Sequence, residues 1–90
     1  MVELTTHVIN EIKGAQGETD IKRIILRAVD DLQNKNNYSG RSKRNFLINT
    51  IVALRYLKLE QVVLESEIPN IDKAIEIFEA LRGKEYGKLF

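Results

Sequence analysis

Residues 41–66 read RSKRNFLINTIVALRYLKLEQVVLES, and at 100° per residue they place apolar side chains on two sides of a helix. The first apolar band consists of Phe46, Leu47, Ile51, Leu54, Leu57 and Leu64. The second band consists of Ile48, Val52, Tyr56, Leu59 and Val63. A helix that is apolar nearly all round must be buried nearly all round, either inside its own bundle or between subunits.

The length of this helix adds a second argument. If the helix runs unbroken from Arg41 to Ser66, it spans about 39 Å, roughly twice the length of the first helix in the chain. Shorter neighbours then leave one band uncovered, and we expect the second band to contact another protein. A break near Leu59, or coverage of both bands by the chain itself, would remove this argument. A strand at residues 62–68 is the competing interpretation, because its valines are β-branched.

Three further segments have helical patterns. The first ends at Gly14, and the second carries apolar residues at helical spacing over residues 21–32. The last follows Pro69, with a cap expected at Asn70 and a stop at Gly83. We therefore expect an all-α protein, a small antiparallel helical bundle of about four helices with a long, largely buried third helix.

The expected domain organisation is simple. Residues 1–83 form a single helical domain, and residues 84–90 form a C-terminal tail. Tyr86, Leu89 and Phe90 are the candidate anchor that would hold this tail against the bundle.

The composition excludes several classes of protein. Lys and Arg number 14 and Asp and Glu 13, so a formal net charge of +1 provides no strong field for an anionic partner. Without cysteine there is neither a disulfide framework nor a thiolate metal site. The N-terminal residues lack a secretory pattern, and the longest uncharged run, residues 45–54, is half the roughly 20 residues of a membrane span. We expect a cytoplasmic protein with no membrane span.

No residue pattern indicates an enzyme. His7 is the only histidine, and we interpret it as an exposed or boundary residue of the first helix. Residues 14–17 read Gly-Ala-Gln-Gly, as in a phosphate-binding loop, but they follow a helical pattern and lack the Lys-Ser/Thr ending. We therefore expect no catalytic residue, no metal ion and no cofactor.

A basic segment at residues 35–44 supports an alternative function. It reads KNNYSGRSKR, with four cations, no acid and one aromatic residue, and it leads into a helix N-terminus. Lys35, Arg41, Lys43 and Arg44 are the candidate phosphate contacts, and Tyr38 is the candidate for stacking on an unpaired base. The alternative is thus a nucleic-acid-binding accessory protein. A solvated basic loop is the structural interpretation of the same segment.

Two parts of the chain are similar to known families. Residues 72–81, DKAIEIFEAL, resemble the second helix of a tetratricopeptide repeat, although they cover half of one repeat and no second copy is present. The layout of residues 19–90 resembles that of the small immunity proteins of Gram-positive bacteriocin producers, with an amphipathic second helix, a long third helix and a tail ending in YGKLF. This second resemblance implies a protein that acts by binding, without catalysis.

The leading hypothesis is a non-enzymatic helical protein-interaction module. It self-associates, for example as a dimer, or acts as a small accessory subunit of a larger complex. The predicted interface is the second band of the long helix: Ile48, Val52, Tyr56, Leu59 and Val63.

Overall fold

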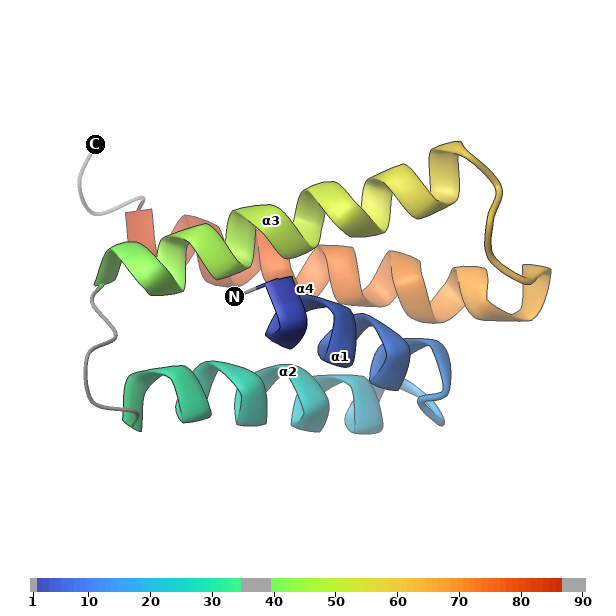
Figure 1. Ribbon diagram of the computed structural model, residues 1–90. Helices are drawn as coiled ribbons and strands as arrows, with labels where there is room; N and C mark the ends of the chain where they lie inside the picture. The colour runs from blue at the N-terminus through green and yellow to red at the C-terminus, as the bar shows by residue number, and fades with distance from the viewer. Residues whose placement is uncertain (1, 35–39, 87–90) are drawn as a thin grey trace.

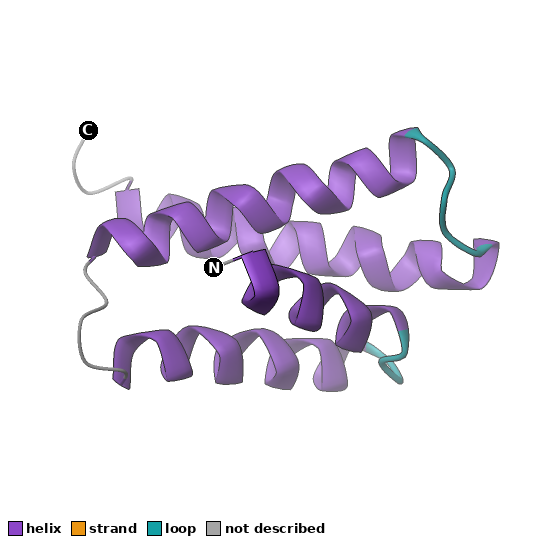
Figure 2. Ribbon diagram, in the orientation of Figure 1, coloured by secondary structure: helices purple, strands orange, loops and turns teal. Residues whose placement is uncertain are grey.

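The computed structural model describes residues 2–34 and 40–86, and within these ranges every regular element is a helix (Figures 1 and 2). The elements are α1 (Val2–Lys13), α2 (Glu18–Asn34), α3 (Gly40–Leu59), the short 3₁₀ helix η1 (Glu65–Glu67) and α4 (Ile68–Tyr86). Consecutive α-helices run in opposite directions (Figure 1). The prediction of a small all-α bundle of four helices is confirmed.

The core is made by one face of each helix. Phe46 of α3 and Phe78 of α4 meet edge to face, with ring centroids 5.9 Å apart and ring planes at 75°. The other fully buried large side chains are Val8, Ile12, Ile21, Ile25, Leu32, Leu47, Leu54 and Ile71, and Thr50 is buried among them. The Thr50 hydroxyl donates to the Phe46 carbonyl at 2.7 Å, so this buried polar group is satisfied within its own helix.

The connection between α1 and α2 is short and depends on one glycine. The prediction that the first helix ends at Gly14 is confirmed, since α1 ends at Lys13. Gly17 has φ of +97°, a backbone conformation that residues other than glycine rarely adopt. Asp20, in the first turn of α2, accepts the Gln16 N–H at 3.0 Å, and this bond is the main cause that lowers the pKa of Asp20.

The third helix, α3, ends at Leu59 and does not run unbroken to Ser66, so the condition for a helix of about 39 Å is not met. The Val62 N–H donates to the Leu57 carbonyl and the Gln61 N–H to the Lys58 carbonyl, both at 3.2 Å, with Gln61 at φ of +55°. This is the Schellman arrangement, which normally places glycine at the left-handed position. Because glutamine stands there instead, the sequence carried no visible stop signal. The competing strand interpretation is wrong, since residues 65–67 form η1.

The start of α4 differs from expectation as well. The helix begins at Ile68, with Pro69 in its first turn, where a missing N–H costs nothing. Asn70 therefore does not cap α4. Its side-chain amide instead donates to the Ile12, Lys13 and Ala15 carbonyls, at 3.2, 3.4 and 2.8 Å. Asn70 thus satisfies the open C-terminal end of α1 and ties α4 to it.

At its other end α4 continues through Gly83 to Tyr86, so the predicted stop at Gly83 is wrong. A glycine inside a helix costs about 1 kcal/mol relative to alanine, which the packing of a 19-residue helix outweighs. The division into a domain and a tail stays a prediction.

An exposed ion pair joins α2 to α4. The Glu18 carboxylate lies 3.3 Å from both the Lys22 and the Lys73 ammonium groups. Hydrogen bonds, first from Lys22 and then from Lys73, lower the pKa of Glu18, and the bond to Glu18 raises the pKa of Lys73. Surface pairs of this kind contribute little to stability, so core packing sets the arrangement of these helices.

We expect Gln61→Gly to stabilise the protein. Glycine removes the strain of the left-handed conformation, which stabilises the folded state, but it also gives the unfolded chain more freedom, which offsets part of the gain. The free energy of unfolding should rise by about 0.5–1 kcal/mol. Urea denaturation of both proteins measures it. Gln61→Ala is the matched control, because alanine keeps the strain, and an equal gain from alanine would contradict the explanation.

The Asn70 contacts generate a second prediction. Asn70→Ala removes a donor from the Lys13 and Ala15 carbonyls, while the Ile12 carbonyl keeps the Ala15 N–H, and it should cost about 1–3 kcal/mol. Asn70→Asp should cost more at pH 7, because a carboxylate would face several carbonyl oxygens at the negative end of a helix. That excess should fade as the pH falls toward about 4, where the carboxyl group protonates. Chemical denaturation at both pH values decides the matter, and an Asn70→Asp protein as stable as the native chain would refute the assignment.

Candidate interaction surface

Four apolar residues of α3 lie exposed in one line. Ile48, Val52, Tyr56 and Leu59 follow at spacings of 4, 4 and 3, which keeps them on one side of a helix. Their exposed fractions are 36, 61, 59 and 78%. We call these four residues the α3 stripe. The opposite face of α3, with Phe46, Leu47, Ile51 and Leu54, is buried.

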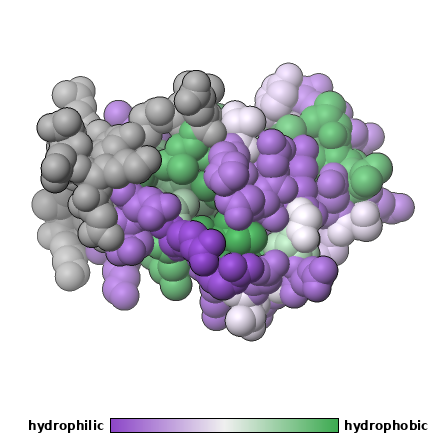
Figure 3. Space-filling model, turned by 60° about the horizontal axis from the view of Figure 1, so that its bottom comes forward, coloured by the Kyte–Doolittle hydropathy of each residue, from purple (hydrophilic) through white to green (hydrophobic). Residues whose placement is uncertain are grey.

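The fifth predicted interface residue, Val63, lies elsewhere. It follows the end of α3 and is half-buried against the core, so it does not continue the α3 stripe. Leu64, assigned to the buried band, is 67% exposed, and Val62 is 58% exposed. Figure 3 shows hydrophobic surface at the end of the bundle where α3 connects to α4. The early end of α3 therefore changes the placement of the apolar residues Val62, Val63 and Leu64.

Because α3 ends at Leu59, the α3 stripe is not exposed because of an unbroken helix of 26 residues. It is exposed for another reason. At about 1.5 Å per residue, the 12 residues of α1 span about 18 Å and the 20 residues of α3 about 30 Å. α1 lies beside α3 and does not cover its outer face (Figure 1).

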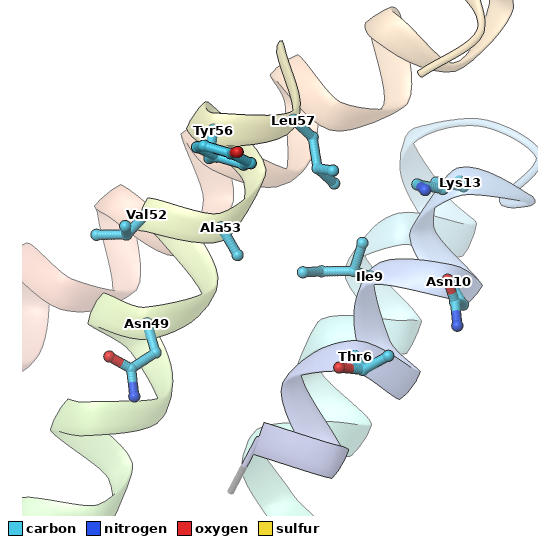
Figure 4. Close-up of a pocket in the computed structure, with 9 residues that line it drawn as sticks. All are labelled: Thr6, Ile9, Asn10, Lys13, Asn49, Val52, Ala53, Tyr56 and Leu57. Carbon is cyan, nitrogen blue, oxygen red and sulfur yellow. The ribbon is translucent and has the colours of Figure 1, made fainter. Parts of the chain in front are cut away.

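A groove separates α1 from α3 next to the α3 stripe. It has a volume of about 490 Å³ and is lined by Thr6, Ile9, Asn10, Lys13, Asn49, Val52, Ala53, Tyr56 and Leu57. Figure 4 shows Ile9, Ala53 and Leu57 directed toward the space between the two helices. Val52 and Tyr56 belong to both the α3 stripe and the groove, so the two features form one surface.

The α1 wall of this groove was not predicted from the sequence. Thr6, Ile9, Asn10 and Lys13 follow at spacings of 3, 1 and 3 and so share one face of α1. That spacing is visible in the sequence. What the sequence does not show is that this face adjoins α3, because that depends on the packing of the whole bundle.

The other edge of the α3 stripe carries ion pairs with α4. Arg55 lies 2.5 Å from the Glu79 carboxylate, and Lys58 lies 2.5 Å from the Asp72 carboxylate. These exposed bonds tie the outer edge of α3 to α4. Within Gly40–Leu59 the charged residues are all cations, and none is acidic.

The basic segment lies only partly within the described residues. Lys35 and Tyr38 fall outside them, and Arg41 is in the first turn of α3. Lys43 is half-buried and Arg44 is exposed, and both interact with other groups of the chain. Nucleic-acid binding by this segment stays a prediction.

The remaining candidates give no further site. Tyr86 is the last residue of α4, and Leu89 and Phe90 lie outside the described residues. His7 is exposed and lies 3.0 Å from the Glu11 carboxylate, one turn along α1. In the part of the chain that the structure describes, no three acidic, histidine or cysteine side chains are grouped to hold a metal ion. No helix there is long and apolar enough to cross a membrane.

Comparison of the chain with protein-family models, curated proteins and solved structures gave no match.

The two faces of α3 should respond differently to truncation. Leu54→Ala, in the core, should cost about 2–5 kcal/mol of unfolding free energy because it leaves a cavity. Val52→Ala, in the α3 stripe, should change it by no more than about 0.5 kcal/mol in dilute protein. Thermal and urea denaturation at low micromolar concentration test both values. Equal costs would place Val52 in the core and contradict the described packing.

Proposed function

We propose that the protein is a non-enzymatic helical interaction module that acts by contact through the α3 stripe. It either self-associates or serves as a small accessory subunit of a larger complex. A cytoplasmic location, expected from the sequence, is part of this proposal.

The observation that carries the proposal is the continuous exposure of the α3 stripe. Single exposed apolar residues are normal on protein surfaces, and Leu26 on α2 is one, at 55% exposed. Four in one line, next to an apolar groove, form a contiguous patch of the kind that marks interaction sites. Tyr56 strengthens the case, because tyrosine is enriched where binding energy concentrates.

The size of the patch indicates the expected strength of contact. The α3 stripe extends over 12 residues, about 18 Å of helix, whereas a stable complex commonly buries about 800 Å² on each partner. At a helix diameter of about 10 Å, one helix face of this length offers less than such an area. We therefore expect contacts of micromolar strength unless a partner adds area elsewhere.

The test replaces Val52 and Leu59 with glutamate in one variant. A contact through the α3 stripe would have to bury the two new carboxylates, which opposes association. The core is not changed, because both positions are exposed in the free chain. The variant should keep its helical circular dichroism and lose the association that the native chain shows in light scattering or co-purification. Leu26→Glu is the matched control, because it changes a similarly exposed leucine on another helix.

Two outcomes contradict the proposal. Loss of helicity in the double variant would place the α3 stripe in the core. A native chain that stays monomeric at high micromolar concentration and co-purifies with no protein would show that the α3 stripe does not bind a protein.

A further inference from the structure

The floor and the edges of the α1–α3 groove differ in chemistry. Ile9, Ala53 and Leu57 form an apolar floor. The polar lining residues are Thr6, Asn10, Lys13 and Asn49. The lining thus contains one cation and no acid. On the α3 side Val52 and Tyr56 extend the apolar area, and an apolar surface with polar residues along one edge suits the apolar face of an amphipathic helix.

The dimensions of the groove also suit a helix. The lining covers residues 6–13 of α1 and 49–57 of α3, which is about two helical turns. The groove lies between the outer sides of two helices and is open to solvent. A site for a small molecule usually encloses most of its ligand, whereas a bound helix needs cover on one face only. The open shape therefore favours a helix.

The charge of the groove selects the kind of helix. Lys13 is half-buried in the last turn of α1, and its ammonium group has no ion pair or hydrogen bond within the described residues. Arg55 and Lys58 of α3 pair with acids of α4, so Lys13 is the cation that the groove itself presents. A partner with acidic residues beside its apolar face complements this surface.

A second copy of the chain fits the groove less well. Among the described helices, α3 is the one that carries a stripe of exposed large apolar residues. Placing α3 of one copy in the groove of another would bring no acid of that helix to Lys13, and the α4 acids beside it, Asp72 and Glu79, are already paired. Lys13 would then be covered without a counter-ion, which opposes this association, so the occupant comes from another protein.

The direction of the occupant follows from the helix ends. α1 and α3 run in the same direction, so both C-terminal ends lie at the end of the groove near Lys13 (Figure 1). Helix C-termini carry partial negative charge and N-termini partial positive charge. A helix that runs opposite to α1 and α3 therefore places its N-terminus at this end of the groove. Acidic residues are favourable in the first turn of a helix, so they would lie beside Lys13.

We infer that the α1–α3 groove binds an amphipathic helix of another protein, antiparallel to α1 and α3. Its apolar residues, at positions i, i+4 and i+7, cover Ile9, Ala53 and Leu57, and an Asp or Glu of its first turn pairs with Lys13. The inference rests on the proposed function, and of the two forms of that function it selects the accessory subunit.

The experiment uses the full chain and three synthetic peptides of about 18 residues, long enough for measurable helicity. All three carry leucine at i, i+4, i+7 and i+11 of an alanine- and glutamine-rich helix. The first has two glutamates in its first turn, the second has two glutamates in its last turn, and the third has two lysines in its first turn. Titration calorimetry at low salt should rank their affinities in that order, with the first at least about tenfold above the third.

Two variants of the chain locate the charge effect. Lys13→Glu should weaken binding of the first peptide about tenfold. Lys84→Glu is the matched control, because Lys84 also lies in the last turn of its helix and does not line the groove. Lys84→Glu should leave the affinity unchanged.

Equal binding of the acidic and basic peptides, equal effects of the two lysine variants, or absence of binding at millimolar peptide would each overturn the inference. The proposed function is tested separately by light scattering. If the native chain self-associates and the Val52 and Leu59 double variant does not, the contact function holds while the helix-binding inference fails.

Discussion

The burial of one face of α3 is the constraint on which the rest of the structure depends. The apolar bands of this helix lie on opposite sides, and a bundle of four short helices has one interior. The edge-to-face contact of Phe46 with Phe78 fixes α3 against α4 and turns the band of Leu47 and Leu54 inward. Val52 and Tyr56, on the other side, must then face outward. Rotating α3 to cover them would expose the first band, which carries the larger buried volume.

Much of the fold follows from the sequence by periodicity. The i, i+3, i+4 pattern of Ile21, Ile24 and Ile25 places α2, and Gly14 marks the end of α1. The errors concern local chemistry that tertiary structure overrides. Gln61 takes a left-handed conformation that is usually adopted by glycine. The side-chain amide of Asn70 donates hydrogen bonds at the C-terminal end of a different helix. Neither event has a signature in a single sequence, because each depends on a neighbour remote along the chain or on strain that packing offsets.

The candidate site was predictable to the extent that it lies on one helix. The placement of Ile48, Val52, Tyr56 and Leu59 on a common face needs only the helical repeat, and their exposure agrees with the expectation that one band stays uncovered. The reason differs from the expected one, since α3 ends at Leu59 instead of running unbroken to Ser66, and α1 lies beside it rather than over it. The groove with Ile9 and Lys13 required the pairing of α1 with α3 and could not be read from either segment alone.

The central claim is that the α3 stripe is exposed in the isolated chain and becomes covered on contact. Because the sequence has no cysteine, Val52→Cys and Leu54→Cys each introduce a unique thiol. The rate of thiol alkylation measures the exposure of each. We predict that the thiol at position 52 reacts as fast as a free thiol in dilute protein, that the one at position 54 reacts far more slowly, and that high protein concentration or the acidic helix peptide protects position 52. Slow labelling at position 52 in dilute protein, or labelling that neither condition slows, would contradict the account.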